Sequence, residues 1–484
     1  MEKIIGRKAE QRLLNDWYGS GNAEFVVVYG RRRVGKTFLI RECLDRRITF
    51  HHTALSPVET GARGQMKSQL QNFWYSLKNH GAAVRQCPKD WMEAFEALIA
   101  FLEELPKNGR MVVFIDELPW MDTPRSGFVP ALEHFWNGWG AKRDDLMLIV
   151  CGSATSWVSD KILGNSGGLY GRATREMRLS PFTLSECEDY FKSRGIIMDR
   201  YSQLQSYMAV GGIPYYLSFY EKGRSLAQNI DNLFFQKGGR LTLEFQRLYS
   251  SVFSQPEAYI KVVRVLASRR EGFTRAEISE KARIPTGGGL TKILEALEVS
   301  DFISSYRYYG RSKRDIYYRL TDFYSLFYLR FVAGNKTTDT NYWENNQLSP
   351  SVTAWRGLSF ELVCFCHISQ LKRAIGISGV HTEVSPWRYE AGKDGRGAQI
   401  DMLIDRADNV IDLCEMKFTL SEFAIDKSYD EALREKLQTF ISRTSCRKTV
   451  HPVLVTTFGL KQNKYSGIIQ RVITMDSLYE NAPF

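Results

Sequence analysis

Residues 26–40, VVVYGRRRVGKTFLI, decide the fold of the N-terminal part of this chain. The β-branched and aromatic residues at 25–29 predict a buried strand, and the apolar residues after Thr37 predict a helix. Between them, residues 30–37 fit the pattern GxxxxGK[ST] in full. The glycines of this pattern let the backbone turn so that its amides and the helix N-terminus point at phosphate oxygens. The stretch therefore predicts a loop that binds the phosphates of ATP.

The side chains of this loop have separate roles in holding Mg·ATP. Lys36 is expected to reach the β and γ phosphates, and the Thr37 hydroxyl is expected to bind Mg²⁺. The residues predicted to contact the nucleotide here are Gly30, Arg33, Val34, Gly35, Lys36, Thr37 and Phe38.

A second part of the same chemistry is the apolar run MVVFID at 111–116, which is followed by Glu117. Such a run is typical of a parallel sheet that is covered on both faces, with its carboxyl end opening onto the ligand crevice. There Asp116 would complete the Mg²⁺ coordination and Glu117 would polarise the attacking water. The pair predicts an enzyme that hydrolyses ATP.

Two further residues are candidates for contact with the γ-phosphate. Ser153 follows an apolar strand predicted at 146–151, and it is either a γ-phosphate sensor or a turn residue at the strand end. Arg172 precedes a strand predicted at 176–179, and it is either an arginine finger for the nucleotide of a neighbouring subunit or a solvated residue at the sheet edge. The first role of Arg172 implies a nucleotide-dependent homo-oligomer.

Composition limits the class of protein. At 484 residues the chain exceeds one ordinary domain, and its 44% hydrophobic and 25% charged residues are typical of globular proteins. No apolar run approaches the length of a membrane-spanning helix, and the eight scattered cysteines indicate reduced thiols, so we expect a cytoplasmic protein with no membrane partner. The net charge of +11 makes a polyanionic partner such as DNA plausible.

Six landmarks occur in order along the N-terminal half: IIGR at 4–7, the GRRRVGKT loop, FIDELPW at 114–120, CGSATSW at 151–157, YGR at 170–172 and GGIP at 211–214. Together they resemble the archaeal-type ATPases of the AAA+/STAND P-loop superfamily. The resemblance implies a five-stranded parallel core at 1–180 and a small helical lid at 181–250. It also implies that Gly6, Arg7 and Pro214 lie beside the adenine.

The middle of the chain, 251–335, has the pattern of a winged helix. Helices are predicted at 258–267, 274–282 and 286–297, followed by a hairpin of alternating aromatic strands around 310–314. Such a domain either contacts DNA or acts as a rigid spacer. The residues that would face DNA are Thr286, Thr291, Lys292, Arg311, Lys313 and Arg314.

A polar linker predicted at 339–351 precedes a third group of charged residues. Glu361 lies in an apolar helix pattern, where a carboxylate is costly unless it has a partner. Asp401 lies in one predicted strand, and Glu415 and Lys417 lie at the end of the next, where residues two apart share a face. If they converge, the carboxylates Glu361, Asp401 and Glu415 would bind Mg²⁺ or Mn²⁺ for phosphodiester cleavage, and Lys417 would either orient the nucleophile or stabilise developing charge.

This C-terminal arrangement, at 350–484, looks like the PD-(D/E)xK nuclease fold, a restriction-endonuclease-like α/β domain. An ATPase with such a tail resembles the archaeal ATPases that carry a DUF234 domain. We therefore expect an α/β protein in which the nucleotide state of a Mg-ATPase controls a metal-dependent DNA nuclease or a DNA-binding module. The alternative is a STAND-type signalling or scaffold ATPase whose nuclease-like domain is catalytically inactive.

Overall fold

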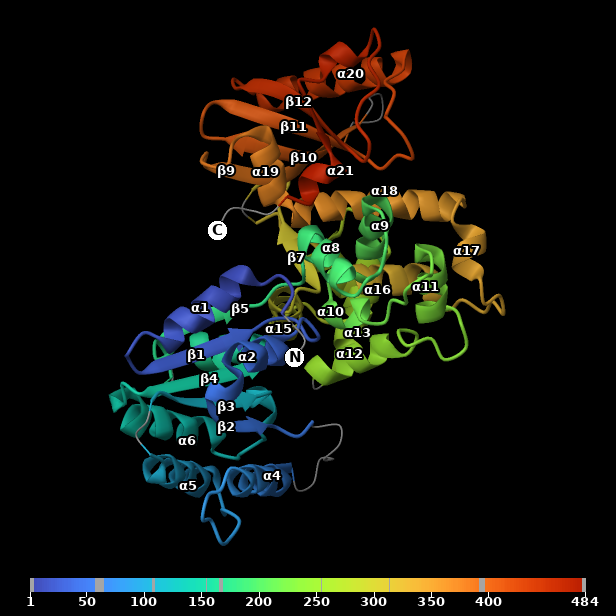
Figure 1. Cartoon of the computed structure of the whole chain (residues 1–484). Coiled ribbons are helices and arrows are strands. Elements are labelled where there is room, and N and C mark those ends of the chain that lie inside the picture. Colours follow the sequence, from blue (N-terminus) through green and yellow to red (C-terminus); the bar gives the residue numbers. More distant parts are fainter. Residues whose placement is uncertain are drawn as a thin grey trace.

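The computed structural model describes residues 4–56, 65–106, 109–153, 155–164, 169–253, 255–312, 314–390 and 397–480. Within these residues the strands form two five-stranded sheets and one three-stranded sheet. Figure 1 shows the N-terminal sheet at the lower left, a helical region and the small sheet in the centre, and the C-terminal sheet at the top. No helix in the described part of the chain is both long and apolar enough to cross a bilayer.

The N-terminal sheet is parallel throughout, in the order β2-β3-β4-β1-β5. Its strands are β1 (Glu24–Tyr29), β2 (Ile48–Thr53), β3 (Met111–Asp116), β4 (Leu146–Gly152) and β5 (Arg175–Arg178). Side chains of β1 alternate between two hydrophobic clusters, with Val26 and Val28 in one and Phe25 and Val27 in the other, so both faces of the sheet are covered. The predicted five-stranded parallel core is confirmed.

Helices flank this sheet and connect its strands. They are α1 (Lys8–Tyr18), α2 (Lys36–Leu44), α4 (Gln65–Asn79), α5 (Trp91–Glu104), α6 (Phe128–His134) and α7 (Thr155–Val158). Helices α4 and α5 lie together at the bottom of Figure 1, beyond β2. Because parallel strands end at the same edge, the loop before α2, the end of β3 and the end of β4 meet there.

The segment 181–250, for which the resemblance implies a lid, contains helices joined by turns. The helices are α8 (Leu184–Ser193), α9 (Arg200–Val210), α10 (Pro214–Leu217), α11 (Leu226–Phe234) and α12 (Glu244–Val252). Helices α8 and α11 begin with capping boxes, in which Thr183 pairs with Glu186 and Ser225 pairs with Gln228.

The middle of the chain contains the helices and the hairpin that its sequence predicts. Its elements are α13 (Pro256–Ala267), β6 (Phe273–Thr274), α14 (Arg275–Ala282), α15 (Gly288–Val299), β7 (Ile303–Tyr306) and β8 (Tyr317–Leu320). The strands form an antiparallel sheet in the order β6-β8-β7. A further helix, α16 (Phe323–Phe327), follows β8 and packs against α9, which joins this region to the helices before it.

The segment predicted as a polar linker is not a free connection. It contains α17 (Tyr342–Asn346), whose first turn is anchored because Asp231 of α11 accepts hydrogen bonds from the N–H groups of Trp343 (2.7 Å) and Glu344 (3.0 Å). The Trp343 ring is buried against the aromatic rings of Phe327 and Trp355. The buried Trp343 ring and the two hydrogen bonds to Asp231 therefore fix this segment against the helices, although its composition is polar.

The C-terminal sheet is mixed, in the order β13-β12-β11-β10-β9. Strands β9, β10 and β11 are antiparallel, and β11, β12 and β13 are parallel. The strands are β9 (Thr382–Tyr389), β10 (Ala398–Arg406), β11 (Val410–Lys417), β12 (Thr449–Thr456) and β13 (Arg471–Thr474). The helices are α18 (Pro350–Cys366), α19 (Ile368–Ile375), α20 (Lys427–Thr444) and α21 (Met475–Leu478).

Two helices cover opposite faces of this sheet. Met402 and Met416 belong to the hydrophobic cluster that includes Phe360 of α18, whereas Leu403 and Leu413 belong to the cluster with Phe440 of α20. The register between β9 and β10 shifts between Ile400 and Leu403, so Asp401 lies in a β-bulge. A bulge re-aims a side chain relative to the regular alternation of a strand, and here it does so at a predicted site residue.

Candidate functional site

The loop before α2 has the backbone that phosphate binding needs. Gly30 has φ 140°, and a Cβ there would lie against the carbonyl oxygen of Leu179, so only glycine fits. Gly35 has φ 93° and forms the N-cap of α2. Lys36 is only 6% exposed, and its Nζ donates to the carbonyl oxygens of Gly30 (2.8 Å) and Arg31 (3.1 Å). Burial lowers the pKa of Lys36 even though nearby Glu117 opposes the shift.

The predicted Mg²⁺ residues of this loop lie together. The Thr37 hydroxyl donates to Asp116 Oδ2 at 2.8 Å, and Asp116 Oδ1 accepts from the N–H of Glu117 at 2.9 Å. A hydroxyl and a buried carboxylate on the same crevice are oxygen donors of the kind that Mg²⁺ prefers. Thr37 and Asp116 therefore fit a Mg²⁺ ion beside the phosphate loop.

Glu117 and Ser153 also meet, although they come from different strands. The Ser153 hydroxyl donates to Glu117 Oε2 at 2.9 Å, and the Ser153 N–H donates to the same oxygen at 3.1 Å. Glu117 itself has a left-handed backbone, with φ 51°. These bonds hold the carboxylate at the end of β4, so any role in activating water requires Glu117 to exchange Ser153 for the water.

The segments that carry the residues predicted beside the adenine meet at Phe182, between β5 and α8. The Arg7 guanidinium lies 4.7 Å from the Phe182 ring centroid and donates to the carbonyl oxygen of Ser180 at 2.6 Å. The N–H of Phe182 donates to the carbonyl oxygen of Gly212 at 2.6 Å, two residues before Pro214 begins α10. Gly6 precedes Arg7 with φ 65° and packs against the side chain of Glu186. In contrast, Arg172 is exposed to solvent.

Two arginines of the phosphate loop have roles that sequence reasoning missed. Arg31 forms a buried ion pair with Asp322 at the N-terminus of α16. Arg33, predicted only as a nucleotide contact, forms an ion pair with Glu244 of α12 at 2.6 Å and lies over the ring of Tyr215. The only sequence signal was three consecutive arginines inside the motif. The loop is therefore tied to both the lid region and the middle of the chain.

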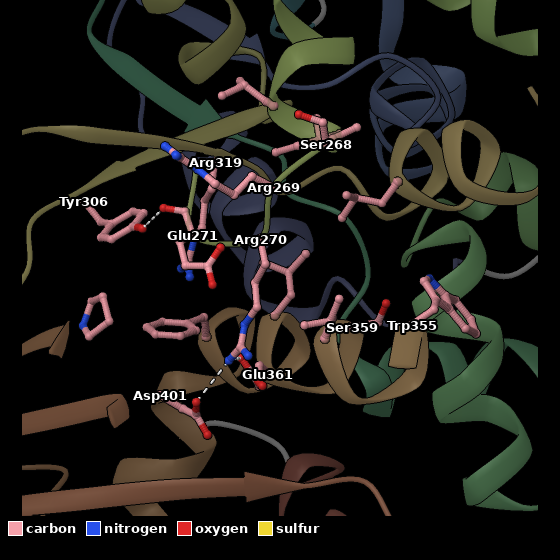
Figure 2. Close-up of a pocket in the computed structure, with 18 of the residues that line it drawn as sticks. Ser268, Arg269, Arg270, Glu271, Tyr306, Arg319, Trp355, Ser359, Glu361 and Asp401 are labelled. Atoms are coloured by element: carbon pink, nitrogen blue, oxygen red, sulfur yellow. Dashed lines mark hydrogen bonds and ion pairs between the residues drawn. The ribbon is translucent and has the colours of Figure 1, made fainter. Parts of the chain in front are cut away.

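In the C-terminal region, two of the predicted carboxylates share one cationic nitrogen. Arg270, from the turn between α13 and β6, directs its Nη2 at Glu361 Oε2 and lies 3.0 Å from Asp401 Oδ1. Figure 2 shows the Arg270 side chain reaching down to both acids. The Glu361 and Asp401 side chains are 16% and 12% exposed. Burial, followed by the charge of Asp401, raises the pKa of Glu361 to about 8.

The third carboxylate, Glu415, has other partners. Its Oε1 accepts from Lys436 Nζ of α20 at 2.5 Å, and its Oε2 lies 3.4 Å from the Tyr429 hydroxyl and 3.9 Å from Lys417 Nζ. Glu415 therefore faces α20, while Glu361 projects from α18 on the other face of the sheet. Asp401 in the bulge shares Arg270 with Glu361, and its Oδ2 accepts from the N–H of Met416, the residue after Glu415, at 3.3 Å. Burial is the main cause that raises the pKa of both Glu361 and Glu415, and the nearby charge of Asp401 adds to it.

The donor chemistry of this region fits one divalent cation at Glu361 and Asp401. A single nitrogen already bridges these two carboxylates, so a cation at that place would have an oxygen ligand from each. The three predicted metal ligands are not brought together as a set: in the described residues, no cluster of three or more His, Cys, Asp or Glu side chains is placed to hold a metal ion. The reason is strand alternation: Glu415 shares the face of β11 that carries Leu413 and faces α20, where it pairs with Lys436.

A cavity of about 180 Å³ opens beside Arg270, between α13, the β7–β8 hairpin and α18 (Figure 2). Asp401, Glu361 and Arg270 line one part of it. Its other polar lining residues include Arg269, Arg319, Arg330, Tyr306 and Tyr308. The acidic pair is thus reached through a largely cationic and aromatic space.

The residues predicted to face DNA are only partly free to do so. Helix α15, which carries Thr291 and Lys292, lies against α7 of the N-terminal region. The Tyr309 ring at the start of the hairpin loop packs on Phe440, 5.6 Å between centroids. Lys292, Thr286, Arg311 and Arg314 are nevertheless exposed, and Lys313 lies outside the described residues.

The comparisons with known proteins bear on the N-terminal part. Residues 5–219 match the sequence model of a family described as an ATPase domain predominantly from Archaea. This part of the chain is therefore an ATPase domain of archaeal type on a parallel P-loop sheet, and the match supports ATP as its ligand.

Individual relatives are distant. The chain is 22% identical over 409 residues to an uncharacterized protein of Methanocaldococcus jannaschii, covering 83% of this chain and 84% of that protein. It is 39% identical over 44 residues to an uncharacterized ATP-binding protein of the same organism, covering 9% of this chain and 75% of that protein. A solved Walker-type ATPase of Pyrococcus abyssi is similar with a TM-score of 0.47 and 21% identity, covering 68% of this chain and 97% of that one. The ORC2 protein of Aeropyrum pernix is similar with a TM-score of 0.42 and 13% identity, covering 68% and 93%.

Proposed function

We propose that the chain hydrolyses Mg·ATP and that its nucleotide state controls a metal-dependent DNA nuclease in residues 350–484. The observation that carries the nuclease half is the meeting of Glu361 and Asp401, from a helix and a strand bulge, on one cationic nitrogen. The antiparallel sheet β6-β8-β7 in residues 251–335 supports a winged helix. The mixed C-terminal sheet, with Glu415 and Lys417 on one strand, supports a PD-(D/E)xK-like domain.

For ATP hydrolysis, each residue of the crevice has a defined task. Lys36 exchanges its bonds to loop carbonyls for bonds to the β and γ phosphates, and Thr37 and Asp116 hold Mg²⁺. Mg²⁺ held by these two residues would neutralise charge that develops on the phosphates. Glu117 orients the attacking water after Ser153 has turned to the γ-phosphate. Arg172, being exposed, remains available to the nucleotide of a neighbouring copy in a homo-oligomer.

For phosphodiester cleavage, Glu361 and Asp401 would hold Mg²⁺ or Mn²⁺, and the metal would supply activation of water and screening of the scissile phosphate. Lys417 stabilises the charge that develops on the phosphate. Glu415 and Lys417 project from the same face of β11, and Glu415 holds Lys417 in place because Oε2 of Glu415 lies 3.9 Å from Nζ of Lys417. Glu415 becomes a metal ligand only if it releases Lys436. DNA is the proposed substrate because the net charge of +11 favours a polyanion.

The two centres are joined by the middle of the chain, which supports control of one by the other. Asp322 of this region pairs with Arg31 of the phosphate loop, and Arg270 of the same region pairs with the C-terminal acids. A movement of the phosphate loop on nucleotide binding is therefore passed through the Arg31–Asp322 pair to the middle region, which carries Arg270.

The test is cleavage of supercoiled plasmid DNA with Mg²⁺ or Mn²⁺, with and without ATP. Asp401→Ala and Lys417→Ala are expected to lose cleavage. Asp405→Ala is the matched control, because Asp405 lies on the same strand but binds Lys448 at 2.5 Å. Wild-type cleavage in both Asp401→Ala and Lys417→Ala would remove the nuclease assignment.

One observation favours the second candidate, a STAND-type switch with an inactive nuclease-like domain. Arg270 and Lys436 already neutralise the acids that would bind metal. This function predicts oligomerisation driven by a non-hydrolysable ATP analogue, measured as a rise in mass, without any metal-dependent cleavage.

A further inference from the structure

We propose that Arg270 is an autoinhibitory plug of the acidic centre: its guanidinium occupies the place of the divalent cation between Glu361 and Asp401, and the middle region must withdraw it before metal binds. This inference rests on the proposed function, because it concerns the regulation of the same centre.

The first support is the position of one atom. Arg270 Nη2 alone contacts both carboxylates, at 3.0 Å from Asp401 Oδ1 and directly against Glu361 Oε2. A divalent cation bound by the same two oxygens would lie about 2.0–2.6 Å from each of them. The two positions overlap sterically, so the guanidinium and the metal exclude each other.

The second support is that the turn carrying Arg270 is fixed from both sides. Arg269 pairs with Glu277 at 2.7 Å and lies 3.8 Å from the centroid of the Phe273 ring. On the other side, the carbonyl oxygen of Glu271 accepts a hydrogen bond from the Tyr306 hydroxyl. The backbone of Arg270 is therefore held so that its side chain points at the acids, as Figure 2 shows.

The third support is that the acidic pair needs a cation for both acids to be ionised. Both acids are largely buried, and two carboxylates in such a place cannot both carry a charge unless a positive group lies between them. An arginine remains charged at every physiological pH, so loss of a proton does not release it. Release has to be mechanical, and the adjoining cavity of about 180 Å³ gives the guanidinium room to swing aside.

The fourth support is the connection to the nucleotide. Arg31 of the phosphate loop pairs with Asp322 and lies over the ring of Phe302, both in the region that carries Arg270. Arg178 at the end of β5 pairs with Asp301 of that region at 2.5 Å. ATP binding at the loop is thus placed to shift the plug.

The experiment measures Mn²⁺ binding to the full chain without nucleotide, by electron paramagnetic resonance and calorimetry. Removing the plug should tighten Mn²⁺ binding roughly tenfold or more, because apparent affinity scales with the fraction of molecules in the open state. Two variants are used, Arg270→Ala and the more conservative Arg270→Gln, with folding checked by thermal unfolding. Arg330→Ala is the matched control, since it removes another arginine that lines the same cavity but bonds to Ser351 and does not touch the acids.

The outcomes separate this inference from the function on which it rests. Tighter Mn²⁺ binding in the Arg270 variants, lost again when Asp401→Ala is added, supports the plug. Equal affinity in wild type and Arg270 variants, with both lost on Asp401→Ala, overturns the plug and leaves the metal centre standing. An equal gain in Arg330→Ala also overturns it, because the effect would then come from any loss of positive charge in the cavity. No Mn²⁺ binding in any variant removes both proposals.

Discussion

Replacement of Asp322 by alanine tests the link between the phosphate loop and the middle of the chain. Asp322 and Arg31 are almost fully buried as an ion pair, and removing one partner of such a pair costs about 3–5 kcal/mol because a charge is left buried and unpaired. Asp322 Oδ2 also accepts the N–H of Ser325 (3.0 Å) as the N-cap of α16, and losing a cap costs about 1 kcal/mol. We therefore expect Asp322→Ala to lower the free energy of unfolding by about 4–6 kcal/mol in total.

The assay is urea unfolding followed by circular dichroism. Asp322→Asn separates the two contributions, because asparagine keeps a capping oxygen but carries no charge, so it should lose about 3–5 kcal/mol. Asp315→Ala, an exposed aspartate of the same region, is the control and should change little. A loss below about 1 kcal/mol in Asp322→Ala would refute the view that this pair holds the loop to the middle region.

Three further outcomes follow from the geometry. Lys36→Ala should abolish ATP binding in calorimetry, since it deletes the ammonium that faces the triphosphate, and retained affinity would contradict that role. Glu117→Gln should keep ATP binding and stop phosphate release, and unchanged turnover would exclude Glu117 as the group that orients water. Burial lowers the pKa of His367 from 6.5 to about 4, although its bond to Val363 opposes the shift. As the pH falls, His367 is therefore protonated in the unfolded chain before it is protonated in the folded chain. The free energy of unfolding keeps its full value above pH 6.5 and falls by about 3 kcal/mol as the pH drops towards 4. His367→Gln should flatten this part of the pH profile of unfolding, and an unchanged profile would contradict the burial argument.

The ATP crevice could be predicted from sequence because its parts obey local rules. A glycine-rich turn between a strand and a helix fixes Lys36 and Thr37, and the end of a buried parallel strand fixes Asp116. Parallel strands bring their carboxyl ends to one edge, so Glu117 and Ser153 meet although they are distant in sequence. The parallel core and the archaeal type of the ATPase domain are confirmed.

The C-terminal centre was predictable only in part. Strand periodicity correctly placed Glu415 and Lys417 on one face, but a regular strand gives no sign of the bulge that re-aims Asp401. Arg270 and Lys436 carry no local signal, since an arginine in a turn and a lysine on a helix are ordinary surface residues until the tertiary fold brings them to the acids.

The same limit applies to the contacts between regions. Nothing in the polar segment at 339–351 indicates that Asp231 caps a helix within it. The motif at 30–37 predicts the backbone conformation around Arg31, but it does not predict that the Arg31 guanidinium forms an ion pair with Asp322. Such pairs depend on how separately folded regions dock, and hydrophobic periodicity does not encode that docking.

Control of the acidic centre by the ATP site is tested by measuring the Asp401-dependent Mn²⁺ affinity with and without a non-hydrolysable ATP analogue. The Mn²⁺ binding measured in Asp401→Ala is subtracted from that of the wild type, because this removes the Mn²⁺ that is bound together with the nucleotide at the phosphate loop. We expect the analogue to tighten this Mn²⁺ binding in wild type and to have no effect in Lys36→Ala. An Asp401-dependent affinity that is the same with and without the analogue in wild type would contradict the claim.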